Sequence, residues 1–172
     1  MRKQKGFSLI ELLIVVAIIL VIAAIAIPSL LRARMSANDS SAAASVRMIN
    51  TAEIAYFATY PTLGYPTLMT TLGGATPCSP GIATGCLIDN SLATNNGGLG
   101  KSGYTFTAVG SASGIVGAVN DQFLATGTPL GALSGSRAYC SIQDAVLRLQ
   151  PAGNITLVAG YNACSALPAL GN

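Results

Sequence analysis

Apolar positions are concentrated near the start of the chain. An uninterrupted apolar run extends from Leu12 to Ile27, and within the wider segment from Leu9 to Leu31 the only charged residue is Glu11. A helix that crosses the hydrocarbon core of a bilayer needs about 20 such residues. The segment therefore predicts a membrane-spanning helix, and the cations that precede it favour a cytoplasmic N-terminus.

The hydrophobic pattern changes after Pro28, where large apolar residues recur at spacings of three and four. This spacing predicts an amphipathic helix that continues to Tyr60 and presents one apolar stripe to a core. The small, polar stretch from Ser36 to Ser45 is expected to be more solvated. The residues of the stripe are Val46, Ile49, Tyr56, Phe57 and Tyr60.

Glu53 interrupts this stripe, and two interpretations of it remain open. Its carboxylate could form a salt bridge between the helix and the rest of the domain, with Arg137 or Arg148 as the partner. Alternatively, the side chain lies at a gap in the packing and is solvated, which is the commoner state of a charged residue.

Glycine divides the chain into two parts. Of its 19 glycines only Gly6 precedes Gly64, so the first part favours helix and the second favours strands and turns. The segment 110–136 shows no clear pattern. The predicted fold class is α+β, with a long N-terminal helix packed on a small antiparallel sheet. Strands are predicted at 103–109, 138–142, 145–149 and 155–159.

The cysteines all lie beyond the helical part, and the chain contains no histidine. Their spacing fits no zinc-binding pattern, whereas an even number of cysteines permits disulfides in an oxidising compartment. Three pairings are possible, and we favour the one with local loop closure, while buried reduced thiols remain the alternative. The favoured pairs are Cys78 with Cys86 and Cys140 with Cys164.

The sequence shows no pattern typical of catalysis or ligand binding. Histidine, the usual general base, does not occur, and the carboxylates are scattered along the chain. The glycine-rich segment 97–102, around Lys101, lacks the spacing of a phosphate-binding loop. Asp121 and Asp144 could supply oxygen ligands to calcium, but no acidic loop surrounds them. We therefore predict no enzyme activity, no cofactor, no metal site and, because charges balance beyond the first six residues, no nucleic-acid binding.

The strongest motif is the order Lys5-Gly6-Phe7-Ser8-Leu9-Ile10-Glu11, which leads directly into the apolar run. It resembles the prepilin leader of type IV pilins and of the pseudopilins of type II secretion systems. The resemblance implies that a prepilin peptidase cleaves between Gly6 and Phe7 and methylates the new amino terminus at Phe7. It also implies a pilin fold. The implied parts are a leader at 1–6, a helix at 7–60 with an assembly half at 7–31 and an amphipathic half at 32–60, and a disulfide-stapled head at 61–172.

Glu11 is costly inside a membrane span, at least about 2.5–3.5 kcal/mol on insertion scales. Once Gly6 is removed, the α-amino group at Phe7 of another copy would be its obvious partner, and that ion pair would set the stagger of neighbouring helices. Alternatively, Glu11 lies shallow and reaches the headgroups.

Pro28 removes a helical hydrogen bond and crowds the carbonyl of Ala24. Pilins that resemble this chain bend at the corresponding proline, and their helices can loosen there in a filament. Pro28 is therefore expected to bend the helix and to serve assembly, although an ordinary kink without such a role is the alternative.

The resemblance also implies partners and a location. Other copies of the chain and minor pilins would be its partners in a helical filament, after earlier contacts with the peptidase, an inner-membrane assembly platform and membrane lipid. The subunit would begin as a single-pass protein of a bacterial inner membrane, with its head outside the cytoplasm. It would end in an extracellular or periplasmic filament.

Three functions fit the sequence. We favour a structural subunit of a type IV pilus, with a type II secretion pseudopilin and a membrane-tethered binding module that never polymerises as alternatives. A secretory signal peptide, suggested by the order Ala24-Ile25-Ala26, would release a soluble domain, but Glu11 within its apolar part fits that model poorly.

Overall fold

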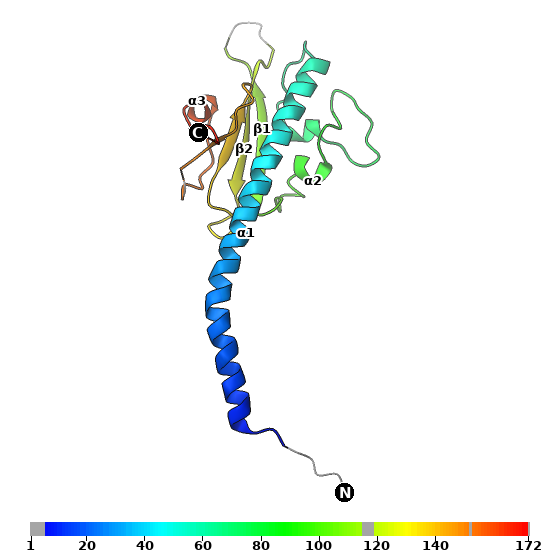
Figure 1. Ribbon diagram of the computed structural model, residues 1–172. Helices are drawn as coiled ribbons and strands as arrows, with labels where there is room; N and C mark the ends of the chain where they lie inside the picture. The colour runs from blue at the N-terminus through cyan, green and yellow to red at the C-terminus, as the bar shows by residue number, and fades with distance from the viewer. Residues whose placement is uncertain (1–5, 115–118, 152, 172) are drawn as a thin grey trace. The chain divides into compact units, whose positions relative to one another are not determined.

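The computed structural model describes residues 6–114, 119–151 and 153–171, so Met1 to Lys5 of the predicted leader lie outside the described residues. The chain divides into two compact units, one ending at Arg34 and the other beginning at Met35. Figure 1 shows the elements of both. In chain order they are α1 (Leu9–Thr59), the 3-10 helix η1 (Met69–Leu72), α2 (Asn90–Ala93), β1 (Tyr104–Ser111), β2 (Gln122–Pro129), β3 (Tyr139–Ile142), β4 (Arg148–Leu149) and α3 (Tyr161–Ser165).

The first unit contains the N-terminal part of α1. Leucine, alanine and isoleucine dominate this part, which has no glycine after Gly6, so the backbone forms helix readily. From Leu9 to Leu31 every side chain is exposed except that of Ala23, which is half-buried. The helix is long and apolar enough to cross a membrane, as the apolar pattern predicted.

The second unit is built on a four-stranded antiparallel sheet in the order β1-β2-β3-β4. The longest pairing joins β1 to β2, from Tyr104 opposite Pro129 to Ser111 opposite Gln122. The C-terminal part of α1 lies across this sheet, as Figure 1 shows. The predicted α+β class, with a helix packed on a small antiparallel sheet, is confirmed.

The apolar stripe predicted on α1 faces the main core. Its members either are buried or pack against the buried cluster, and they meet alternate residues of β1. The prediction that 36–45 is solvated is wrong at its C-terminal end, where Ala42, Ala43 and Ser45 are buried. These small residues face the core because α1 must approach the sheet closely. A Cβ atom on Gly127 of β2 would lie only 3.0 Å from Cγ2 of Val46.

A second, smaller core covers the other face of the sheet. Along β3, Tyr139 belongs to the main core, whereas Cys140 and Ile142 belong to the second one, as expected for a strand with both faces covered. The disulfide between Cys140 and Cys164 joins this face to α3. The C-terminal segment is therefore fixed against the sheet.

The strand predictions were only partly right. Those at 103–109 and 138–142 are confirmed as β1 and β3, and the one at 145–149 shortens to β4. The prediction at 155–159 is wrong, because this segment covers the second core through Val158 without pairing in the sheet. The longest omission is β2, which lies within the unassigned 110–136.

The connection from α1 to β1 carries η1, α2 and the disulfide between Cys78 and Cys86. The carboxylate of Asp89 caps α2 by accepting a hydrogen bond from the N–H of Leu92 at 2.8 Å. Leu72 and Leu92 from these two short helices are fully buried in the main core. The long connection is therefore folded onto the head.

Candidate assembly site

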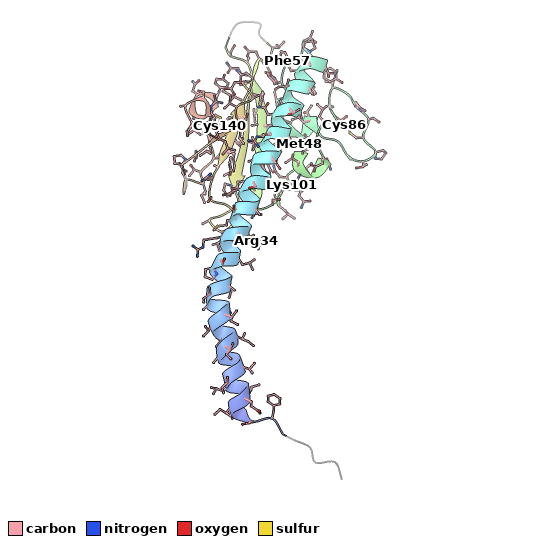
Figure 2. All side chains as sticks on the ribbon, in the orientation of Figure 1. Arg34, Met48, Phe57, Cys86, Lys101 and Cys140 are labelled. Carbon is pink, nitrogen blue, oxygen red and sulfur yellow. A yellow bond between two sulfur atoms is a disulfide. The ribbon has the colours of Figure 1, made fainter. Side chains whose placement is uncertain are left out.

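The N-terminal part of α1 presents a large apolar surface. Exposed fractions reach 80% at Leu9 and 73% at Ile25, and Figure 2 shows side chains projecting from both sides of the helix. Soluble proteins rarely expose contiguous apolar surface of this extent, so the surface indicates contact with lipid or with other helices.

The bond between Gly6 and Phe7, predicted as the processing site, lies before the first residue of α1. Phe7 is 83% exposed, and among the described residues no atom beyond the chain neighbours of Gly6 lies within 4 Å of the place that a Cβ on Gly6 would occupy. A peptidase needs an accessible, non-helical peptide bond, and this segment offers one.

Glu11 caps the helix in which it lies. The backbone N–H of Ser8 donates a hydrogen bond to Oε2 of Glu11 at 3.0 Å, and the N–H of Leu12 donates to the carbonyl of Ser8 at 3.3 Å. This is the glutamate half of a capping box, in which a Ser followed three residues later by Glu marks a helix start. The sequence analysis missed this role, although the order Ser8-Leu9-Ile10-Glu11 carries its signal.

The capping contact leaves part of Glu11 available. Within the described residues Oε1 accepts no hydrogen bond, and the side chain is exposed. The positive end of the helix dipole also favours an anion in this first turn. One carboxylate can therefore order the helix start and still meet a cation from outside the chain.

Pro28 lies inside α1 and has no N–H to donate to the carbonyl of Ala24. One helical turn after the proline, Nε of Arg32 donates a hydrogen bond to the carbonyl oxygen of Pro28 at 3.3 Å. The proline thus creates one weak point in the hydrogen-bond ladder of the apolar half, and its role in assembly stays a prediction.

Polar side chains attach the C-terminal part of α1 to the head. Nδ2 of Asn50, which is buried, donates to Oγ of Ser141 at 2.7 Å and to the carbonyl of Ile142 at 2.9 Å. The hydroxyl of Tyr56 donates to the carbonyl of Ile82 at 2.7 Å. Sequence analysis did not single out Asn50, because a polar residue on a helix shows a structural role only when its partners are known.

Both interpretations of Glu53 were wrong. The side chain is fully buried, and neither carboxylate oxygen has a hydrogen-bond partner among the described residues. Ion pairs in the described ranges do not include it, since Arg148 pairs with Asp144 instead. Burial raises the pKa of Glu53 to about 8, well above its usual value of 4.5, so the carboxyl is protonated at neutral pH.

The two aspartates considered for calcium are engaged by protein groups. Oδ1 and Oδ2 of Asp121 accept from the N–H and the hydroxyl of Ser113, each at 2.6 Å. Asp144 accepts from the two terminal guanidinium nitrogens of Arg148, Nη1 and Nη2. Within the described part of the chain, no group of three or more acidic or cysteine side chains converges as metal ligands would.

Comparisons with known proteins support the importance of the N-terminal segment. Residues 1–27 match the family model for the prokaryotic N-terminal methylation motif. Over 40 residues the chain is 65% identical to the type IV wide pilus major component PilA4 of Thermus thermophilus. This alignment covers 23% of this chain and 30% of that protein. Over 55 residues it is 42% identical to the type IV major pilin protein PilA of Myxococcus xanthus, 32% of this chain and 25% of that protein.

The aligned part therefore spans less than a third of each of these relatives. No solved structure matches the chain. Both relatives are pilus components by name.

Proposed function

We propose that this chain, whose first residues carry the N-terminal methylation motif, is a structural subunit of a type IV pilus. The observation that carries the proposal is the exposed apolar half of α1, which directly follows Gly6 and Phe7. A precursor could hold this helix in the membrane, and a filament could bundle it with the same helix of other copies.

Processing prepares the subunit for assembly. Cleavage after Gly6 leaves a positive, methylated amino group on Phe7, immediately before the helix start. The apolar side chains then exchange lipid contacts for contacts with neighbouring helices, where packing and interhelical polar contacts stabilise association. The heads remain at the surface of the filament.

The register of neighbouring helices rests on Glu11 in this proposal. Its Oε1 has no partner in the described residues, and the surrounding apolar side chains exclude water in a bundle. Opposite charges attract far more strongly in such an environment than in water. The amino group of Phe7 from a neighbouring copy is the cation that the motif supplies.

Substituting Glu11→Ala tests the proposal. We expect the variant to insert in the membrane and to lose its leader normally but to yield few filaments in electron micrographs of material sheared from cells. Ser29→Ala, which removes the other polar side chain of the span, is the matched control and should assemble normally. Normal filament yield from the Glu11→Ala variant would refute the register role.

The mature amino terminus provides an independent test. Purified from its own cells, the chain should begin at Phe7, carry one extra methyl group and lack four thiol protons. An intact Met1 would exclude processing. Loss of protein secretion in a deletion strain that never forms surface filaments would instead assign the chain to a secretion pseudopilus.

A further inference from the structure

Two loops of the head converge on the start of α1 in the second unit. Nδ2 of Asn38 donates to the carbonyl of Ser134 at 2.7 Å, and the hydroxyl of Ser41 donates to that of Ser102 at 3.0 Å. The loops 97–103 and 130–136 thus meet the helix at its residues 38–41. The N–H of Leu130 also donates to the carbonyl of Gly103 at 2.9 Å, which joins the loops to each other.

These loops expose three leucines, which we call the leucine rim: Leu99, Leu130 and Leu133. Their exposed fractions are 76%, 52% and 70%. The loops also approach closely, since a Cβ on Gly100 would lie 3.0 Å from Cδ1 of Leu130. A single exposed leucine is ordinary, but three on adjoining loops form an apolar edge that points to a partner.

The peptide chain itself limits how far the leucine rim can lie from the apolar segment. Asn38, which the rim loops contact, follows Leu31 by seven residues, and α1 is continuous between them. Seven helical residues span about 10 Å, and even a fully extended chain would span only about 25 Å. This limit holds whatever the angle between the two units.

Charge favours a bilayer surface at this distance. Arg32 and Arg34 are both exposed and lie between the apolar segment and Asn38, where cations reach lipid headgroups. The acidic groups near the rim are already engaged, because Asp39 accepts from Ser136 and Asp89 pairs with Lys101 at 3.2 Å. The loops 97–103 and 130–136 themselves contain no aspartate or glutamate, so no carboxylate of theirs opposes contact with headgroups.

We propose that the leucine rim seats the head of the unassembled subunit on the outer surface of the membrane that holds its N-terminal helix. The rim leucines enter the interfacial layer, and the head is restrained before polymerisation. This inference rests on the membrane insertion proposed above. A second copy of the chain is the competing occupant, and the test distinguishes the two.

Tryptophan fluorescence offers a direct test, because the chain contains no tryptophan. Leu133→Trp and Leu99→Trp each place one reporter on the rim of the full chain, reconstituted in phosphatidylcholine–phosphatidylglycerol vesicles. Ile82→Trp is the control, because Ile82 is 61% exposed and lies far from the rim. The carbonyl of Ile82 accepts a hydrogen bond from the hydroxyl of Tyr56, and Tyr56 follows Asn38 on α1 by eighteen residues. That separation is about 27 Å along the helix.

We expect lipids brominated near the headgroup to remove most of the emission at positions 133 and 99, with a shift to shorter wavelength, and to leave position 82 unchanged. Equal quenching at all three positions, or none, would overturn the proposal. Reporters that are solvated on vesicles but shielded in filaments would also overturn it and make the rim a contact between copies.

Flotation of the vesicles separates this inference from the proposed function. If the chain floats with the vesicles but its leucine rim is solvated, the helix is inserted in the membrane and only the proposed contact between the rim and the membrane is refuted. A chain that does not float overturns both. In the Leu133→Trp protein, adding Leu99→Ser and Leu130→Ser should reduce quenching without affecting flotation.

Discussion

The hydroxyl of Tyr104, a buried residue, donates a hydrogen bond to the carboxylate of Asp39, and this bond connects β1 to α1. The same carboxylate accepts from the N–H of Ser136 at 3.0 Å and from its hydroxyl at 2.6 Å. Burial, followed by the hydrogen bond to Asp39, raises the pKa of Tyr104 far above its usual value of 10. One acidic side chain therefore ties together the helix, the first strand and the loop between β2 and β3.

Replacing Tyr104→Phe should destabilise the head by about 1.5–3 kcal/mol, the range for a hydrogen bond to a charged group. The ring remains and only the donor is lost, so packing is preserved. Urea unfolding of the detergent-solubilised chain, followed by circular dichroism, measures the effect. Thr105→Val on the same strand, half-buried at the strand surface, is the control and should change stability less. Equal stability of Tyr104→Phe and the parent would show that the Asp39 contact contributes nothing.

Glu53 should make the head less stable as pH rises. The folded state holds the proton up to a pKa of about 8, whereas the unfolded chain releases it near 4.5. Between these values the folded state binds more protons, so the free energy of unfolding falls by up to about 1.4 kcal/mol per pH unit. The loss is absent below pH 4.5 and complete above pH 8.

The neighbouring titratable groups do not compete in this window. Tyr56 and Tyr65, which Glu53 influences, have pKa values raised above 10 by burial and stay neutral. Urea unfolding at pH 5 and pH 8.5 should therefore differ by a few kcal/mol in the parent and much less in Glu53→Gln. An unchanged pH dependence in that variant would assign the effect to other groups.

The two disulfides should differ in both stability and reactivity. Loop entropy predicts contributions of about 2.5 kcal/mol for Cys78–Cys86, separated by 8 residues, and about 3.5 kcal/mol for Cys140–Cys164, separated by 24. Cys140 and Cys164 are fully buried, whereas the other pair is half-buried. Stepwise reduction with alkylation and mass spectrometry should label Cys78 and Cys86 first. Earlier labelling of Cys140 would contradict this order.

Gly110→Ala should weaken the attachment of the loop that follows α1. An added Cβ would lie 2.4 Å from the carbonyl oxygen of Tyr65 and 2.7 Å from that of Pro66, so the backbone must shift. Overpacking of this kind costs about 1–3 kcal/mol. Gly131→Ala is the matched control, because nothing lies within 4 Å of the added atom. Thermal unfolding that is equal for both variants would refute the contact.

The sequence was sufficient for features encoded by local patterns. The apolar helix is visible because membrane spans need a long uninterrupted run, and β1 is visible because only one of its faces is buried, which gives clean alternation. β2 was missed for the opposite reason. Both of its faces are covered by packing, and Gly127 and Pro129 further obscure a strand pattern.

The candidate site shows the same limit. Glu11 and Phe7 were identified because the motif that contains them is a short stretch of sequence. The hydrogen bond from Ser8 to Glu11 that caps the helix could also be predicted from the residue order. The burial of Glu53 was not, because it depends on side chains contributed by distant segments. A charged residue on a helix gives no local signal that it lacks a partner.

Spaced attachment of α1 also has a mechanical consequence. The polar contacts of Asn38, Asp39, Asn50 and Tyr56 are distributed over about 27 Å of one helix. Tension applied along the helix axis loads them in parallel, as shear, and all must yield together. A lateral force would peel them apart one at a time, so a fibre made of such subunits should bear pulling far better than bending at the head.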